Sequence, residues 1–284
     1  MCGIVGYIGF REAYPIIIKG LQRLEYRGYD SAGVALLNGD MHIYKKQGKV
    51  SDLEAFVANQ PTSATLGMGH TRWATHGEPS DRNSHPHTSN NGKLSIIHNG
   101  IIENYSSIKE EMIKRGHTFN SDTDTEVLIH LIEDIQEKTK QTLDESVRIA
   151  LKEVVGAYAI VVVSEDHPEE IIAARKGSPM VIGVGEGEYF IASDASPIIE
   201  YTKNVIFLND SEMAIVKRDS LVIKTIDNIV QDPYIHELEA VMYKKGFNHM
   251  TQIAIQGLAS GNDNRICSRF SLNNAASCWI ARTR

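Results

Sequence analysis

The chain opens with the stretch Cys-Gly-Ile-Val-Gly-Tyr-Ile-Gly, residues 2–9. β-Branched and aromatic residues favour a strand, and glycines inside a strand let another part of the molecule approach its backbone closely. The stretch therefore predicts a strand that begins at residue 2 and lies inside the fold. It also places Cys2 at the position that becomes the N-terminus once Met1 is removed.

The residues that follow predict helices and strands in separate blocks. An amphipathic helix is expected over residues 12–26, and Asn38-Gly39 predicts a tight hairpin between strands at 34–37 and 41–44. Further strands are expected at 94–98, 157–163, 171–174, 180–184, 189–192, 205–208 and 212–216, and further helices at 105–115, 124–137 and 143–154. Because strand and helix do not alternate, the fold class is α+β with antiparallel sheets, not a Rossmann fold.

The length of 284 residues with 42% hydrophobic side chains suffices for one large domain or two small ones. We place one domain at residues 2–240. From about Tyr243 no sustained apolar period continues, so residues 241–284 are treated as an atypical tail. This tail is expected to be disordered or not native to the family of the preceding domain.

Charge and cysteine content narrow the functional classes. A net charge of −7 and an isoelectric point near 5.9 disfavour nucleic acid and anionic membrane as partners. No run approaches the roughly 18 apolar residues of a membrane-spanning helix, and no basic segment indicates a signal peptide. The three cysteines cannot form a complete disulfide framework. These features predict a soluble protein of the reducing cytoplasm.

A cysteine at an exposed N-terminus combines a thiol nucleophile and an amine base on one residue. A free α-amine has a pKa of roughly 7.7 to 8.0, so an appreciable fraction is neutral at pH 7 and accepts the thiol proton. N-terminal threonine nucleophiles use the same pairing. The alternative is that Cys2 is a small buried hydrophobe on a strand, and for Cys2 taken alone this is the better interpretation.

Histidines gather between residues 70 and 98, at His70, His76, His85, His87 and His98. They raise the alternative of a zinc site. However, neither a helical His pair with a central Glu nor a Cys-x-x-Cys pair is present, so the spacing disfavours metal. Glycine, proline and serine between residues 77 and 86 instead predict a loop that keeps these histidines solvated.

Two charged positions suit an amino-acid ligand. The planar guanidinium of Arg72 makes bidentate hydrogen bonds with a carboxylate. An α-ammonium group needs a carboxylate partner, for which Asp122 and Asp124 are the candidates. Either aspartate is also a good N-cap for the helix that follows, so one can cap the helix while the other binds the ligand.

Asn99-Gly100 has two interpretations. A turn is the default for this dipeptide. The alternative is an oxyanion hole, in which an asparagine amide and a backbone N–H stabilise developing negative charge and each donor is worth about 10²-fold or more in rate. Similarly, Arg27-Gly28-Tyr29-Asp30 is either a functional segment or a surface turn with Arg27 paired to Asp30.

Four segments together resemble the class II glutamine amidotransferases, which are N-terminal nucleophile hydrolases, and among them the glutaminase domain of the glucosamine-6-phosphate synthases (glutamine:fructose-6-phosphate aminotransferases). The segments are Arg-Leu-Glu-Tyr-Arg-Gly-Tyr-Asp-Ser-Ala-Gly (23–33), His-Thr-Arg-Trp-Ala-Thr-His-Gly-Glu-Pro (70–79), His-Asn-Gly-Ile-Ile-Glu-Asn (98–104) and Ser-Asp-Thr-Asp-Thr-Glu-Val (121–127). The resemblance covers about residues 2–240. It implies a four-layer αββα sandwich with two antiparallel sheets.

The resemblance also implies roles for catalytic residues. Cys2 is similar to the nucleophile that attacks the glutamine side-chain amide, with its own α-amine as base and then as acid. Asn99 and the Gly100 N–H resemble the oxyanion hole. Arg27 is similar to a support for the N-terminus, and Trp73 to a gate for released ammonia.

The same resemblance assigns substrate contacts and partners. Arg72 with Thr75 and His76 is similar to the group that holds the glutamine α-carboxylate, and Asp124 to the group that holds the α-ammonium. The implied reaction is hydrolysis of L-glutamine to glutamate and ammonia through a Cys2 thioester, with no cofactor and no metal. Fructose 6-phosphate is implied only for a complete synthase, which forms a homodimer. A complete synthase also has two sugar-isomerase domains, and the residues after 240 do not resemble them.

Two other functions remain open from the sequence. An N-terminal nucleophile amidase could act on a different amide, and the loop histidines could make the chain a non-catalytic metal-binding or regulatory module.

Overall fold

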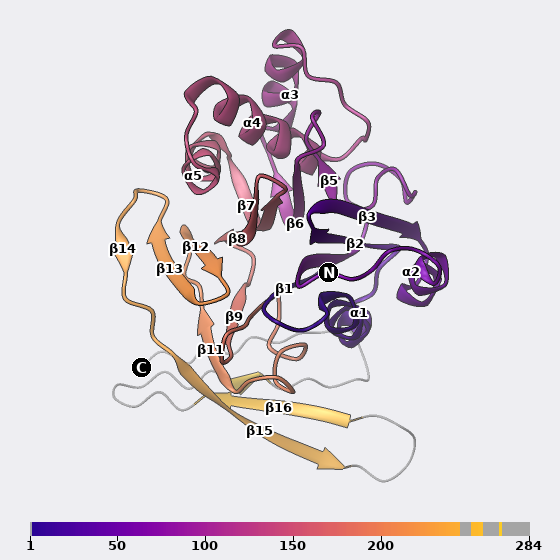
Figure 1. The fold of residues 1–284 in the computed structure, drawn as a ribbon, viewed down its shortest axis with the longest axis vertical. Coiled ribbons are helices and arrows are strands. Elements are labelled where there is room, and N and C mark those ends of the chain that lie inside the picture. The colour runs from indigo at the N-terminus through magenta and orange to yellow at the C-terminus, as the bar shows by residue number, and fades with distance from the viewer. Residues whose placement is uncertain (1, 245–250, 258–266, 269–284) are drawn as a thin grey trace.

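The computed structural model describes residues 2–244, 251–257 and 267–268 (Figure 1). Within these residues the strands form two antiparallel sheets, one of ten strands in the order β17-β16-β15-β11-β9-β10-β1-β4-β2-β3 and one of seven in the order β14-β13-β12-β8-β7-β6-β5. The first sheet contains β1 (Gly3–Ile8), β2 (Ser31–Asn38), β3 (Asp40–Gln47), β4 (Leu66–Arg72), β9 (Val181–Val184), β10 (Tyr189–Ala192), β11 (Asn204–Phe207), β15 (His236–Lys244), β16 (Thr251–Gly257) and β17 (Cys267–Ser268). The second contains β5 (His87–Thr88), β6 (Leu94–Ile102), β7 (Gly156–Ser164), β8 (His167–Lys176), β12 (Glu212–Lys217), β13 (Ser220–Thr225) and β14 (Val230–Gln231).

Five α-helices of the described residues cover the outer faces of the two sheets. Helices α1 (Ala13–Leu24) and α2 (Val50–Val57) pack on the first sheet, and α3 (Tyr105–Lys114), α4 (Asp124–Thr139) and α5 (Leu143–Glu153) on the second. Strand β7 shows the layering, because Val161 and Val163 belong to the core between the sheets whereas Ile160 and Val162 belong to the core under the helices. The predicted α+β class and the αββα sandwich of two antiparallel sheets are confirmed.

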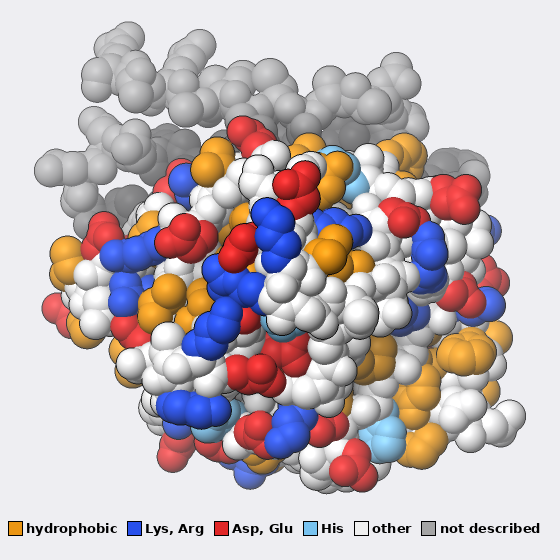
Figure 2. Space-filling view, turned by 90° about the horizontal axis from the view of Figure 1, so that it is seen from above, with side chains coloured by type: hydrophobic (Ala, Val, Ile, Leu, Met, Phe, Trp, Pro, Cys, Tyr) orange, Lys and Arg blue, Asp and Glu red, His pale blue; other side chains and the backbone are white. Residues whose placement is uncertain are grey.

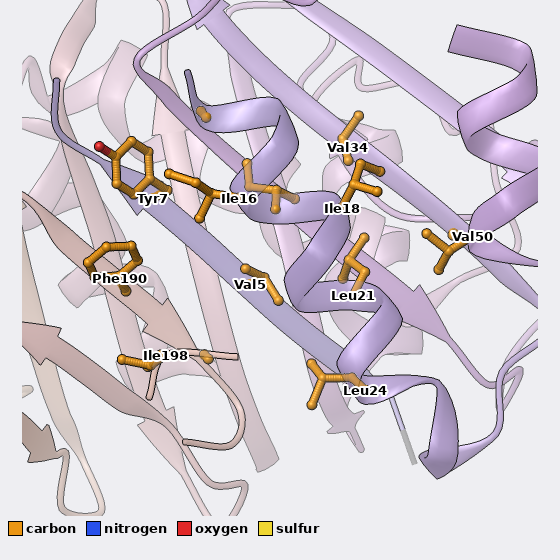
Figure 3. Packing of buried hydrophobic residues seen from close by; sticks show 14 of the residues in the cluster. Val5, Tyr7, Ile16, Ile18, Leu21, Leu24, Val34, Val50, Phe190 and Ile198 are labelled. Carbon is orange, nitrogen blue, oxygen red and sulfur yellow. The ribbon is translucent and has the colours of Figure 1, made fainter. Parts of the chain in front are cut away.

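Strand β1 lies in the middle of the first sheet, between β4 and β10. Its register with β4 pairs Gly3 with Thr71, which brings the start of the chain beside Arg72. Helix α1 packs over these strands through side chains that include Leu21, which belongs to the same buried cluster as Val5 and Val34 (Figure 3). The opening segment is therefore a buried strand, as predicted.

Most predicted elements are present within a few residues of their expected bounds, but the sequence missed helix α2 and several strands, namely β4, β5, β13, β14, β15, β16 and β17. Strand β4 was not predicted because Gly67 and Gly69 weaken its strand signal. Strand β6 runs through Asn99-Gly100, so the interpretation of this dipeptide as a turn is wrong. The predicted domain boundary at residue 240 falls within β15, and most of the predicted tail lies outside the described residues.

Four histidines that the sequence placed in a solvated loop are buried, on strands β4, β5 and β6 and on the connection between β4 and β5. His70, His85, His87 and His98 are all at most 5% exposed. The His85 ring lies 4.2 Å from that of His70 and 4.7 Å from that of His87. Burial lowers the pKa of all four, that of His70 to about 3, so they are neutral at pH 7.

On the surface at the end of the molecule that carries α3 and α4, Lys and Arg side chains are interspersed with Asp and Glu (Figure 2). In the part of the chain that the structure describes, none of the helices combines the length and apolar character that crossing a membrane requires.

Close packing of α1 on β4 depends on Gly69. A Cβ at this position would lie 2.4 Å from Ile17 Cγ2 and 3.0 Å from Leu21 Cδ1. We expect Gly69→Ala to lower the free energy of unfolding by about 1–3 kcal/mol through overpacking. Urea unfolding measures the loss, and Gly69→Ala in an Ile17→Ala background should cost less than in the parent chain. Additive losses in this cycle would contradict the proposed clash.

The buried histidines make the fold sensitive to mild acid. Their folded pKa values lie below the unfolded value near 6.5, so their contribution to stability is present above that pH and declines as the pH falls below it. Each approaches a slope of about 1.4 kcal/mol per pH unit. Between pH 7.5 and 5.5 the urea midpoint should therefore fall, and His87→Gln should flatten this slope whereas His167→Gln should not. Equal midpoints at the two pH values would show that the histidines are not neutral in the fold.

Candidate active site

A pocket of about 350 Å³ opens beside the first residue of β1, where the ends of β4 and β6 meet the start of α4. This volume lies in the range of small-molecule sites. Eight residues predicted from the sequence line it: Cys2, Arg27, Arg72, Trp73, Thr75, Asn99, Gly100 and Asp124. Of the residues to which the family resemblance assigns a role, His76 alone does not line the pocket itself.

The Cys2 thiol contacts the main chain of the residue that follows Arg72. Cys2 Sγ accepts a hydrogen bond from Trp73 N at 3.2 Å and lies 3.6 Å from Trp73 O, to which it donates. Burial raises the pKa of the thiol above its ordinary value, although the Trp73 N–H acts in the opposite direction. The thiol is therefore protonated at pH 7, and its use as a nucleophile requires a base.

Strand β6 of the second sheet brings Asn99 to the same pocket. Asn99 Nδ2 donates to Cys2 O at 3.3 Å, and Asn99 Oδ1 lies 2.9 Å from His70 Nε2. Because the amide oxygen of Asn99 accepts from the neutral His70, its NH₂ group is directed toward Cys2. Gly100 has φ of +140°, and a Cβ there would lie 2.0 Å from Ala157 O, so the backbone at this position requires glycine.

Arg72 ends β4 and is 4% exposed. Its Nη2 donates to the carbonyl oxygens of His76 and Gly77. Its Nη1 is buried and has no hydrogen-bond partner among the described residues. A buried donor without a partner is costly, and a ligand carboxylate would satisfy it. Burial lowers the pKa of Arg72 and nearby carboxylates oppose this shift, so the guanidinium remains charged.

Of the two candidate aspartates, the structure places Asp124 in the pocket and Asp122 outside it. Asp124 is the first residue of α4 and is 4% exposed; its Oδ2 accepts from Ile102 N at 2.8 Å. Its carboxylate lies at the positive end of the helix dipole. Asp122 instead forms an exposed ion pair with Arg82. The helix N-cap is Thr123, so neither aspartate has that role.

Three residues of the segment after β4 lie around the pocket. Trp73 is 55% exposed, and its indole packs over the backbone of Gly28. Thr75 is an exposed lining residue. His76 Nδ1 is buried without a hydrogen bond and lies 3.9 Å from Asp124 Oδ1.

Arg27 lies beneath the start of the chain and does not pair with Asp30. Its Nη1 donates to Cys2 O at 3.3 Å and to Ser193 Oγ at 3.1 Å, and its Nη2 forms an ion pair with Asp194 Oδ2 at 2.9 Å. The interpretation of an Arg27–Asp30 surface pair is therefore wrong. Asp30 Oδ2 instead accepts from Ala74 N at 2.5 Å and holds the segment after Arg72 in place.

Sequence reasoning missed two parts of this site. Gly177, Ser178 and Pro179, which follow β8, line the pocket, and their Gly-Ser-Pro composition was the only signal, one of a turn. Ser193 and Asp194, which hold Arg27, follow β10 and lie 166 and 167 residues from it along the chain. Nothing local in the sequence indicates this contact.

Known glutamine amidotransferases are similar to this chain in sequence. Residues 53–245 match the family described as the glutamine amidotransferase domain. A glutamine–fructose-6-phosphate aminotransferase (isomerizing) from Chlorobaculum tepidum is 55% identical over 256 residues, and one from Thermococcus kodakarensis is 47% identical over 255. Both alignments cover 88% of this chain, which spans 42% of the length of each relative.

Solved structures show the same fold. A glutamine phosphoribosylpyrophosphate amidotransferase from B. subtilis superposes with a TM-score of 0.68 at 28% identity, over 79% of this chain and 49% of that one. The structure titled as the allosteric regulatory enzyme of purine biosynthesis gives a TM-score of 0.69, also at 28% identity, over 80% and 50%. Together with the family match over more than half of its length, these similarities show that the chain belongs to the glutamine amidotransferase family.

Proposed function

We propose that this chain hydrolyses L-glutamine to glutamate and ammonia through a γ-glutamyl thioester on Cys2. The observation that carries the proposal is one pocket containing the Cys2 thiol, the unpartnered Nη1 of Arg72 and the carboxylate of Asp124. A nucleophile, a cation and an anion in one pocket match the amide, α-carboxylate and α-ammonium of glutamine. The domain that acts in this way is placed at residues 2–240.

The proposed first step begins with transfer of the Cys2 thiol proton to the α-amine of the same residue. The sulfur then forms a bond to the side-chain carbonyl carbon of glutamine, and the carbonyl oxygen becomes an oxyanion. Asn99 Nδ2 and the Gly100 N–H stabilise this charge. In this proposal His70 is a positioning residue, because its hydrogen bond to Asn99 Oδ1 fixes which side of the amide faces the oxyanion.

Collapse of this intermediate breaks the carbon–nitrogen bond, and the α-ammonium returns its proton to the leaving ammonia. Water then attacks the thioester, releases glutamate and restores the thiol. Arg27 supports the reacting terminus through Cys2 O, and its ion pair with Asp194 fixes the guanidinium. The exposed indole of Trp73, whose main chain contacts the thiol, is proposed to gate the released ammonia.

Substrate recognition is proposed to use both charged ends of the pocket. Arg72 Nη1 binds the α-carboxylate, with Thr75 and His76 beside it. Asp124 binds the α-ammonium through Oδ1, since Oδ2 is held by the Ile102 N–H. These two contacts select an amino acid over a simple amide.

The acceptor of the ammonia is proposed from the relatives. Glutamine–fructose-6-phosphate aminotransferases match 88% of this chain over 42% of their own length, so we propose that the complete protein transfers ammonia to fructose 6-phosphate. We further propose that it acts as a homodimer in the cytoplasm without a nucleic-acid partner, in keeping with the net charge of −7.

Replacement of the nucleophile tests the thioester. Cys2→Ser and Cys2→Ala should each lower glutamate release by at least about a thousandfold, because the remaining groups bind glutamine but form no thioester. Mass spectrometry of acid-quenched wild-type chain should detect the glutamyl adduct on the N-terminal peptide. Full activity in Cys2→Ser would exclude the mechanism.

Removal of Met1 tests the base. In preparations with different proportions of retained Met1, activity should scale with the fraction that begins at Cys2, since a peptide bond to Met1 removes the free amine. The N-terminal mass and the rate of glutamate release are measured on the same samples. Equal activity in chains that retain Met1 would show that another group is the base.

Substitutions of Asp124 and Arg72 test amino-acid recognition, and the same substitutions of Asp122 and Arg82 serve as controls. Asp124→Asn and Arg72→Ala should each lower kcat/KM for glutamine about ten- to a hundredfold, the loss expected for a hydrogen bond to a charged group. Asp122→Asn and Arg82→Ala alter the neighbouring exposed ion pair, and each should change kcat/KM for glutamine less than twofold. An unchanged kcat/KM in Asp124→Asn and Arg72→Ala would favour an amidase for a different substrate.

A further inference from the structure

A second cluster of titratable side chains lies on α4 and on the connection that precedes it. His130 and Glu133 are buried on α4, and His117 follows α3. Glu133 Oε2 lies 3.4 Å from His117 Nδ1 and 3.5 Å from His130 Nδ1. One ligand atom of each of the three residues lies within 4.8 Å of the other two. The same edge of each imidazole therefore faces one carboxylate oxygen.

The two oxygen-to-nitrogen separations match those between ligands of a tetrahedral metal ion. With metal–nitrogen and metal–oxygen bonds of about 2.0–2.2 Å, the ligand atoms of a tetrahedral zinc site lie about 3.3–3.6 Å apart. The oxygen-to-nitrogen distances of 3.4 and 3.5 Å in the cluster fall in this range. They are too long for good hydrogen bonds between nitrogen and oxygen.

The opposite edge of each imidazole faces a further carboxylate. His117 Nε2 lies 3.6 Å from Asp134 Oδ1, and His130 Nε2 lies 3.5 Å from Glu126 Oε1. Histidine ligands of metals commonly direct the second ring N–H to a carboxylate, which fixes the ring and raises its basicity. Both outer carboxylates are held in turn: Ser121 N and Oγ donate to Glu126, and Arg115 pairs with Asp134.

His130 supplies an independent observation. Its side chain is 1% exposed, and neither ring nitrogen makes a hydrogen bond with the described residues. Each ring nitrogen instead lies 3.5 Å from a carboxylate oxygen, of Glu126 or of Glu133, so the buried ring is flanked by negative charge that a bound cation would offset.

The charges of the cluster also suit a cation. Glu126, Glu133 and Asp134 carry three negative charges, whereas Arg115 and Lys138, which pair with Asp134, supply two positive ones. The charges of these five side chains sum to −1, which favours a cation.

One existing contact must change. His117 Nδ1 lies 3.0 Å from Asn90 Oδ1, and metal binding would replace this hydrogen bond. Asn90 Oδ1 would keep the Thr118 N–H at 3.1 Å. Glu133 Oε2 accepts from Asn90 N at 2.9 Å and has a second lone pair for the metal.

We propose that His117 Nδ1, His130 Nδ1 and Glu133 Oε2 bind one divalent transition-metal ion of the zinc class, with water in the fourth position. Imidazole and carboxylate ligands suit this class. The ion would tie the connection between α3 and α4 to α4 itself. That connection leads into Thr123 and Asp124, which line the pocket, so the metal would stabilise the segment that places Asp124. This proposal does not depend on the glutaminase activity.

The test uses the full chain with its cysteines replaced or alkylated, so that they do not bind the metal. Because the amine and thiol of Cys2 would themselves chelate zinc, the titration uses Cys2→Ala with its remaining cysteines alkylated. After chelator treatment, Zn²⁺ alone should bind at one equivalent, measured by competition with a chromophoric chelator. At a hundredfold excess over Kd the Tm should rise by about 5–10 °C. Co²⁺ in place of Zn²⁺ should give the intense visible bands of a tetrahedral site.

Variants locate the ion. His117→Ala replaces a side chain at the edge of the fold and should abolish the one-equivalent binding, the Tm rise and the cobalt bands, as should Glu133→Gln. His167→Ala, outside the cluster, should retain all three. The proposal is overturned if the parent binds no zinc, or if His117→Ala and Glu133→Gln bind as the parent does.

Discussion

The pairing of β1 with β4 is the constraint on which the rest of the site depends. Gly3 opposite Thr71 places Cys2 beside Trp73, and from this one register follow both contacts of the thiol with the main chain. A shift by one residue would exchange the faces of β1 and remove Val5 and Tyr7 from the core under α1. The apolar packing of the first sheet therefore also determines where the thiol lies.

The second sheet contributes the rest of the pocket independently. Asn99 and Gly100 come from β6, and Asp124 comes from the helix that packs on the outer face of that sheet. His70 joins the two halves, since it lies on β4 and contacts Asn99 on β6. Within the second half, His87 on β5 contacts Thr123 just before α4. Polar groups that are neutral and buried make directional contacts without the cost of a buried charge.

The sequence was most informative where a local pattern determines the structure. Periodicity identified α1, α4 and α5, and the αββα sandwich followed from family motifs. It was least informative where contacts join distant residues. Arg27 finds Asp194 across 167 residues, and β4 is a strand because its neighbours on both sides pair with it, despite Gly67 and Gly69. The site residues were found by resemblance, whereas the burial of the histidines required the three-dimensional path of the chain.

The position of Trp73 has a practical consequence. The chain has two tryptophans, and Trp73 lies at the rim of the pocket and is 55% exposed. The main chain of this same residue contacts the Cys2 thiol. Indole emission depends on the polarity around the ring, so the protein carries its own optical label at the mouth of the pocket. Ligand arrival and departure can be followed in real time by stopped-flow fluorescence, without chemical modification of the chain.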